Sequence, residues 1–185
     1  MIKKLNILGI NGSASQNSSN LAILKAIGKL GGIEINLTII ENLRHLPHFQ
    51  IELTSDNTPP SITKFRKQLE NADGIIISTP EYVFSIPSGL KNALEWCVST
   101  TILSDKSVGL ITASANGKMG HEELKLIMKT VQTYFTDTTT LLIPGVKGKV
   151  NEMGEIINDK TQVELLDFTK SFIEATKKHI GFVSY

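Results

Sequence analysis

The chain of 185 residues contains a single cysteine, Cys97. One thiol can form no internal disulfide and cannot supply a cysteine cluster for a metal. Cys97 follows Trp96 in a segment of helical pattern, where a cysteine is far more often a small core residue than a nucleophile. The four histidines are scattered without the spacing of metal ligands. We therefore expect neither a bound metal nor a catalytic cysteine.

The chain also lacks an excess of charge of either sign. It has 19 basic and 18 acidic residues, a formal net charge of +1 and a pI near 7.8. This balance argues against a surface that binds polyanions, and equally against the acidic surface of a small electron carrier. Nucleic acid is therefore not an expected partner.

Long apolar runs are missing as well. The first one, residues 5–10, ends at the Asn11-Gly12 turn. It is too short for the apolar region of a signal peptide or for a membrane span. We expect no membrane partner and a cytoplasmic location.

Three common nucleotide-binding or catalytic motifs do not occur. Gly9 and Gly12 lack the Gly-x-Gly-x-x-Gly spacing of the dinucleotide fingerprint. Residues 112–119 end in Gly-Lys-Met, without the leading glycine and the final Ser or Thr of a P-loop. Gly-x-Ser-x-Gly is absent, so there is no nucleophile elbow. These absences argue against P-loop kinases and ATPases and against serine hydrolases.

What the sequence does contain is a regular alternation of apolar runs and helical patterns. Runs typical of strands lie at residues 5–10, 33–40, 73–79, 107–112 and 139–143. Helical patterns follow at residues 21–30, 58–71, from 87, 124–135 and from 159, where Asp159 and Gln162 resemble a capping box. Five strands alternating with five helices predict an α/β fold, a doubly wound parallel sheet with helices on both faces. The length suits one domain, residues 1–185.

Three loops follow strands of this predicted sheet, at residues 11–20, 80–85 and 113–120. They have the least ordinary composition of the chain. Ligands of doubly wound sheets bind beyond the carboxyl ends of the strands. The three loops are expected at the same edge of the sheet. Together they indicate a binding site more strongly than any one of them does.

The first loop combines glycine, hydroxyls and a helix N-terminus. This arrangement holds phosphate through free N–H groups and the helix dipole. Side-chain donors that add no charge come from Ser13, Ser15, Ser18, Ser19 and Asn20. The alternative is a serine-rich surface turn with a good N-cap.

The second loop carries two aromatics in a stretch bounded by Pro80 and Pro87. A rigid turn with exposed amides and an aromatic side chain suits a flat heteroaromatic ligand. The composition is equally compatible with Tyr82 and Phe84 packing the loop down onto the protein.

The chain resembles the NADPH-dependent FMN reductases of the flavodoxin-like fold, a family of flavin, quinone, azo and chromate reductases. The resemblance covers nearly the whole chain. It rests on Gly12-Ser13 with Ser18-x-Asn20, and above all on the run from Pro80-Glu81-Tyr82 to Lys91-Asn92-Ala93-Leu94-Glu95-Trp96. It implies the strand order 2-1-3-4-5, FMN as cofactor, NADPH or NADH as reductant, a small electron acceptor, and a homodimer or homotetramer.

The resemblance also implies where FMN binds. The first loop would hold the phosphate, the second would lie against the isoalloxazine ring, and the third would touch the flavin from the other side. With the donors of the first loop, the expected cofactor-binding residues are Ser13, Ser15, Ser18, Ser19, Asn20, Pro80, Glu81, Tyr82, Val83, Phe84, Ser85, Ser114 and Gly117. Two positions depart from the family: many relatives have arginine at the position of Ser15, and relatives commonly have Asn-Gly in place of Val83-Phe84. We expect looser FMN binding and a more apolar surrounding of the ring.

The implied function is that of an oxidoreductase. A hydride passes from the nicotinamide to flavin N5, and the electrons leave to an acceptor such as free flavin, a quinone, an azo compound or a metal oxyanion. Because this step needs no protein acid or base, we expect no catalytic side chain. Two alternatives stay open: a flavodoxin-type electron carrier, and a non-catalytic FMN-binding module. NADPH oxidation with an added acceptor distinguishes the three.

Overall fold

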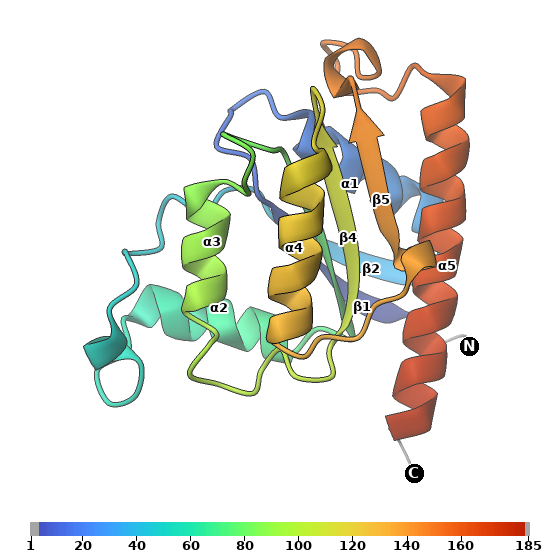
Figure 1. The fold of residues 1–185 in the computed structure, drawn as a ribbon. Helices are drawn as coiled ribbons and strands as arrows, with labels where there is room; N and C mark the ends of the chain where they lie inside the picture. Colours follow the sequence, from blue (N-terminus) through green and yellow to red (C-terminus); the bar gives the residue numbers. More distant parts are fainter. Residues whose placement is uncertain (1–3, 184–185) are drawn as a thin grey trace.

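The fold is built on one parallel sheet (Figure 1). The computed structural model describes residues 4–183. The strands are β1 (Leu5–Asn11), β2 (Ile35–Ile40), β3 (Gly74–Thr79), β4 (Ser107–Ser114) and β5 (Thr140–Pro144). Each neighbouring pair is parallel, and the order is β2-β1-β3-β4-β5. This confirms the predicted doubly wound sheet and its strand order.

Helices cover both faces of the sheet (Figure 1). They are α1 (Ser19–Gly31), α2 (Pro60–Glu70), α3 (Ser88–Glu95), α4 (Lys118–Thr130) and α5 (Asp159–Val183). Ile23 of α1 and Phe172 of α5 belong to one buried cluster. Phe65 of α2 and Leu124 of α4 belong to the cluster on the other face. β3 is buried along its whole length between the two clusters, which explains its three consecutive isoleucines, residues 75–77.

Several predicted boundaries differ from the structure by one or more residues, and two of these differences have a clear physical reason. β2 begins at Ile35 rather than at residue 33, because Ile33 lies exposed in the turn after α1. α4 ends at Thr130, before the last three members of the predicted apolar stripe, Val131, Tyr134 and Phe135. Tyr134 instead forms a parallel bridge beside β4 and stacks on His179, with ring centroids 4.2 Å apart. Its half-buried position therefore comes from its contacts with β4 and with His179 of α5.

The predicted capping box of α5 is also wrong. Asn158, one residue earlier, accepts a hydrogen bond at Oδ1 from the Thr161 N–H, 3.0 Å away. The Gln162 side chain donates to the Ile156 carbonyl instead of returning to the start of the helix. An Asn N-cap satisfies the first turn as well as an Asp would.

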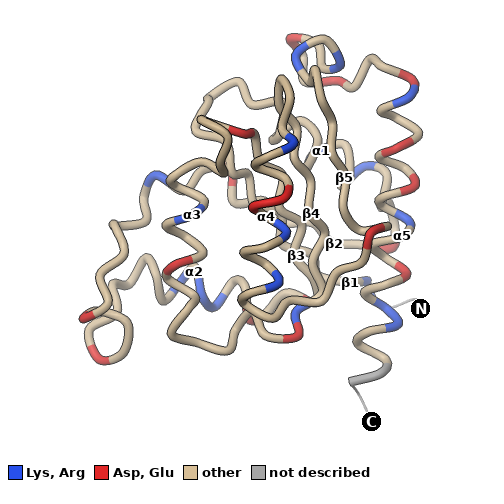
Figure 2. The backbone as a smooth tube through the Cα atoms, in the orientation of Figure 1, with Lys and Arg blue, Asp and Glu red and all other residues tan. Residues whose placement is uncertain are grey.

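Acidic and basic residues are interspersed along the chain (Figure 2). Within residues 4–183, the helices include none that could cross a membrane. Within the same residues, no group of three or more His, Cys, Asp or Glu side chains is arranged to hold a metal ion.

Candidate functional site

A cleft of about 550 Å³ opens at the carboxyl edge of the sheet. It lies where the loops after β1, β3, β4 and β5 come together, at the upper end of the strands in Figure 1. Its walls are Ser13, Ser15, Asn17, Ser18, Ser19, Asn20, Pro80, Tyr82, Ala113, Ser114, Ala115, Gly145, Val146, Lys147 and Gly148. Eight of the thirteen predicted site residues are among them. Glu81, Val83, Phe84, Ser85 and Gly117 are not.

The loop between β1 and α1 is folded around its own polar groups. Ser18 caps α1: its Oγ accepts from the Leu21 N–H and donates to Asn11 Oδ1. Asn11 Oδ1 also accepts from the Ser13 N–H. The N–H groups of Ser19 and Asn20 have no preceding helical turn to donate to. They are left for a ligand of the cleft that both residues line, and an anion is the ligand that a helix N-terminus favours.

The loop also approaches β3 closely. A Cβ added at Gly12 would lie 2.5 Å from Thr79 Oγ1, so only glycine fits there. The absence of a side chain at this position lets the first loop lie against the start of the second. The two loops therefore form one continuous wall.

Asn20 has a structural role that the sequence did not reveal. Its side chain is buried, with Nδ2 donating to the Ala113 carbonyl at 3.1 Å. Its Oδ1 accepts from Ser78 Oγ at 2.9 Å. The amide thus ties the first turn of α1 to the ends of β3 and β4. Any contact of Asn20 with a bound anion is left to its backbone N–H.

The second loop contains a two-residue turn. Tyr82 and Ser85 exchange both backbone hydrogen bonds, at 2.8 and 3.0 Å. Val83 and Phe84 between them have φ of 52° and 60°. Left-handed backbone at both central residues favours Asn-Gly and is strained for a β-branched residue. Strain of this kind persists mainly at functional sites.

The exposure of the side chains decides between the two interpretations of the second loop: a surface for a flat ligand, or a loop whose aromatic side chains pack onto the protein. Val83 is 94% exposed and Phe84 is 74% exposed, so neither packs the loop onto the protein. Tyr82 lines the cleft, and its hydroxyl lies 3.5 Å from Ser13 Oγ. The tip therefore projects apolar surface beyond the cleft, while Tyr82 forms part of its wall.

The second loop is held from behind by α4. Glu81 Oε2 accepts from the Gly120 N–H at 2.8 Å, and Glu123 Oε2 accepts from the Ile86 N–H at 3.0 Å. Ser114 Oγ donates to the Glu81 carbonyl. The side chain of Glu81 is thus a tether to α4, away from the cleft. Gly117, with φ of 86°, starts α4 and shapes the third loop, and Ser114 is the predicted residue of that loop that reaches the cleft.

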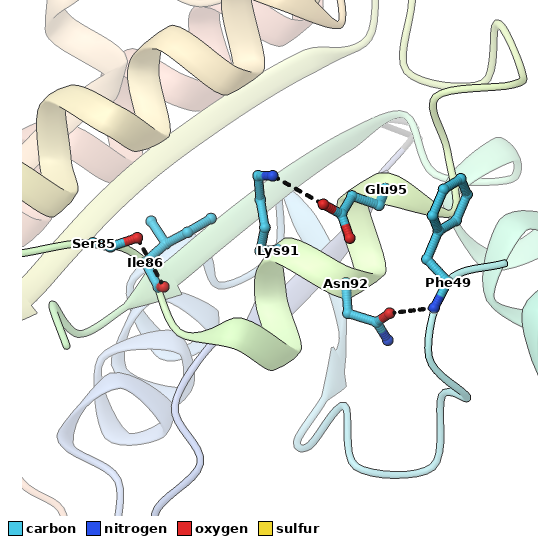
Figure 3. Close-up of polar contacts among 6 residues, drawn as sticks. All are labelled: Phe49, Ser85, Ile86, Lys91, Asn92 and Glu95. Atoms are coloured by element: carbon cyan, nitrogen blue, oxygen red, sulfur yellow. Dashed lines mark hydrogen bonds and ion pairs between the residues drawn. The ribbon is translucent and has the colours of Figure 1, made fainter. Parts of the chain in front are cut away.

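The segment that carries the family resemblance, residues 91–96, anchors another loop (Figure 3). Asn92 accepts at Oδ1 from the Phe49 N–H, 2.8 Å away, and its Nδ2 donates to the Pro47 carbonyl. Trp96 Nε1 donates to the same carbonyl at 2.8 Å. Lys91 pairs with Glu95 on the exposed side of α3. The long connection between β2 and α2 is therefore fastened to α3, out of contact with the cleft.

The fourth wall of the cleft, formed by residues 145–148, was not predicted from the sequence. These residues follow β5 in a short 3-10 turn. The Gly145 N–H donates to the Ala115 carbonyl, which joins this turn to the third loop. Because β5 is parallel to its neighbours, the same rule that identified the other three loops applied here too.

His121 and Cys97 are two of the groups outside the cleft whose pKa values are shifted. Burial lowers the pKa of His121, whose Nδ1 lies 3.0 Å from Thr112 Oγ1 beneath the third loop. Burial raises the pKa of the Cys97 thiol to about 12, against a smaller opposing effect of Arg66. Neither residue lines the cleft. The walls of the cleft offer hydroxyls, amides and one ammonium group, without a carboxylate, imidazole or thiol.

We expect the Cys97 thiol to be inert in the native protein. A thiol-reactive reagent at mildly alkaline pH should modify it only after unfolding, because the thiolate is the reactive form. The unfolded chain releases this proton near the ordinary value of 9.0, and the folded protein holds it to about 12. The free energy of unfolding should therefore fall as the pH rises above 9. Cys97→Ala is the control, in which this part of the pH dependence of the unfolding free energy should disappear. Rapid labelling of the native protein would contradict the prediction that the thiol is inert.

The chemistry of the cleft suits FMN. The first loop and the start of α1 offer N–H and O–H donors to a phosphate. Pro80, Tyr82 and Ala113 add mainly apolar surface for a ring. A planar molecule that carries a phosphate matches both.

Comparison with known proteins agrees with this geometry. The pattern of the family described as NADPH-dependent FMN reductase matches residues 5–147. The NADH:(hydroxy)cinnamate reductase subunit CrdA of Vibrio ruber is 29% identical over 180 residues, 94% of this chain and 88% of that protein. The quinone reductase of Escherichia coli is 26% identical over 170 residues, 87% and 89% of the two chains. The structure of FerB from Paracoccus denitrificans, described as a flavoenzyme NAD(P)H:(acceptor) oxidoreductase, superposes with a TM-score of 0.83 at 23% identity, covering 95% and 98% of the chains.

Proposed function

The chain belongs to the NADPH-dependent FMN reductase family, and from this premise we propose that it is a single FMN-binding domain that passes electrons from NAD(P)H to a planar, largely apolar acceptor such as a quinone. Membership confirms the family predicted from the first loop and from residues 80–96. It also confirms the class of activity, an NAD(P)H-dependent flavoenzyme oxidoreductase, with FMN and NAD(P)H as cofactors. The acceptor and the residues that bind FMN are the proposed part.

The first loop is proposed to hold the phosphate. The Ser19 and Asn20 N–H groups and the hydroxyl of Ser19 are the donors that the loop presents to the cleft, whereas Ser15 Oγ donates to the Asn17 carbonyl within the loop. Ser13 and Ser18 are largely engaged in shaping the loop, and they set the direction of those donors. Asn20 fixes the helix start to β3 and β4 through its side chain.

The second and third loops are proposed to orient the ring. Pro80 and Tyr82 form one wall and Ser114 with its alanine neighbours the other. When bound, FMN supplies the redox chemistry, taking a hydride at N5 and giving its electrons to the acceptor. The protein contributes position and exclusion of water, and the tethers from Glu81 and Glu123 to α4 keep the second loop in place.

The tip of the second loop supports the choice of acceptor. Tyr82, Val83 and Phe84 form an exposed apolar surface at the mouth of the cleft, and large apolar side chains left in water often mark binding sites. A flat quinone could stack there, whereas a hydrated oxyanion gains nothing from it. Family membership favours turnover over the two alternatives, an electron carrier and a non-catalytic module.

One experiment tests the proposal. We expect purified protein loaded with FMN to lose its flavin absorbance on anaerobic addition of NADPH, and to regain it when a quinone is added. Catalytic NADPH oxidation should then follow the quinone concentration. Bleaching without reoxidation by quinone contradicts the proposed acceptor. Retention of FMN without bleaching favours a carrier or a binding module.

A homodimer or homotetramer and a cytoplasmic location stay predictions. The family resemblance supports the first, and the requirement for NAD(P)H supports the second. Light scattering after gel filtration, at several protein concentrations, measures the oligomeric state directly.

A further inference from the structure

One charged side chain lines the cleft, Lys147. It also lines the adjoining groove that runs past Asn17, Ser18 and Ser19 at the start of α1. Lys147 has no hydrogen bond or ion pair among those found for residues 4–183. An unpaired ammonium group therefore borders the end of the cleft where the phosphate is expected.

The turn that carries Lys147 is firmly placed. Val146, the preceding residue, is buried in the core between the sheet and α5. Gly145, with φ of 64°, donates its N–H to the Ala115 carbonyl at 3.0 Å. Lys149 donates its N–H back to the Val146 carbonyl. The backbone of Lys147 is thus fixed to the third loop on one side and to the core on the other, while its side chain is exposed.

The first loop supplies no cation of its own, since residues 11–20 contain neither Lys nor Arg. The nearby basic residues are engaged elsewhere. Arg44 donates to the Ala14 carbonyl and is not among the residues that line the cleft. Lys25 lies 3.9 Å from Glu41. Glu152 is the acidic residue that lines the groove with Lys147 and Lys25, and no ion pair of 4.0 Å or less joins it to Lys147 within residues 4–183.

We propose that Lys147 is the counter-charge of the FMN phosphate in this protein, delivered from the loop after β5 because the first loop carries Ser15 and no basic residue. The inference rests on the proposed FMN site. An ammonium group beside a dianion at a helix N-terminus adds a charge-assisted contact to the N–H and hydroxyl donors. The four-carbon stem of lysine suits a reach from an exposed turn to the mouth of the cleft.

The test compares FMN with riboflavin, which lacks the phosphate. Apoprotein is titrated with each ligand and the dissociation constants are measured by quenching of flavin fluorescence, without turnover. Lys147→Gln is expected to weaken FMN binding about tenfold, the effect of losing one partly exposed charge-assisted contact. Riboflavin binding should stay unchanged. Salt should weaken FMN binding less in the variant than in the parent protein, because one ionic contact is gone.

Two further variants serve as controls, one for the loss of a positive charge near the cleft and one for the replacement of the Lys147 side chain by another cation. Lys149→Gln removes a positive charge two residues away, from a side chain outside the walls of the cleft, and should leave both affinities as they are. Lys147→Arg keeps the charge and should bind FMN nearly as tightly as the parent protein.

The outcomes separate this inference from the proposed function. If the parent protein binds FMN no better than riboflavin, the inference is overturned. Equal weakening by Lys147→Gln and Lys149→Gln overturns it too, because general charge then accounts for the effect. Unchanged FMN affinity in Lys147→Gln, with a raised KM for NADPH but not for NADH, would assign Lys147 to the nucleotide phosphate instead. A parent protein that binds neither flavin contradicts the FMN site itself.

Discussion

Replacing Trp96 by alanine is expected to lower the free energy of unfolding by roughly 3–5 kcal/mol, the usual result of truncating a large buried aromatic side chain. Trp96 is fully buried, and its ring meets that of Phe49 edge-on with centroids 5.3 Å apart. The indole N–H holds the Pro47 carbonyl at 2.8 Å. The variant loses the packing and the anchor of the long loop together, and chemical denaturation measures the loss.

Less drastic substitutions separate the packing of the Trp96 ring from its hydrogen bond to the Pro47 carbonyl. Trp96→Phe keeps most of the volume and leaves Pro47 bonded to Asn92, so about 1–2 kcal/mol should be lost. Combining it with Asn92→Ala removes both donors to Pro47 and the acceptor of the Phe49 N–H. The double variant should therefore lose more than the sum of the two single ones. Strict additivity would show that the two donors do not act on one loop.

Changing Val83-Phe84 to Asn-Gly should have the opposite effect, raising the free energy of unfolding by roughly 2 kcal/mol. Both residues have left-handed backbone, which Asn and Gly adopt at little cost. Since both side chains are mostly exposed, their removal sacrifices little buried surface. For a chain of this length the gain corresponds to an increase in Tm of about 4–8 °C.

Val98→Asn provides the matched control. Val98 is 65% exposed and is not among the residues with positive φ, so this change should bring no gain in stability. The proposed acceptor surface adds a second measurement. The Asn-Gly variant should show a raised KM for a quinone with unchanged FMN affinity. A lower Tm in the Asn-Gly variant would contradict the strain, and an unchanged KM would contradict the role of the tip.

The second prediction describes a loop that is tethered behind and strained at its tip. Glu81 and Glu123 join the second loop to α4 through hydrogen bonds to Gly120 and Ile86. The tip at residues 83–84 is the part that departs from good local geometry. A gain in stability accompanied by a poorer acceptor KM would be the trade between stability and activity that functional sites commonly show.

Local pattern was sufficient for much of the fold. Patterns typical of strands located all five. The inner strands β1, β3 and β4 gave the clearest signal, because a parallel strand covered on both faces is buried at nearly every position. Helix ends were less certain. Tyr134 continued the apolar spacing of α4 but lies beside β4, because spacing alone does not say which element a residue will pack against.

The candidate site was predicted in part. The rule that ligands bind at the carboxyl ends of strands identified three of the four loops, and eight of the thirteen predicted residues line the cleft. Glu81 was placed at the ring but reaches Gly120, a residue 39 positions along the chain. Asn20 was assigned to the phosphate, yet its amide joins Ser78 and Ala113, 58 and 93 positions away.

The sequence alone determined the alternation of strands and helices, the three polar loops and the family, because each depends on residues near one another in the chain. The tertiary structure decided which groups of those loops face the cleft and that Val83 and Phe84 lie in left-handed backbone. It also decided that Lys147 lies beside the first loop. The physical reason is that these features depend on how distant segments pack. The sheet brings residues 13–20 and 145–148 to one edge, and no pattern local to either segment records that they meet.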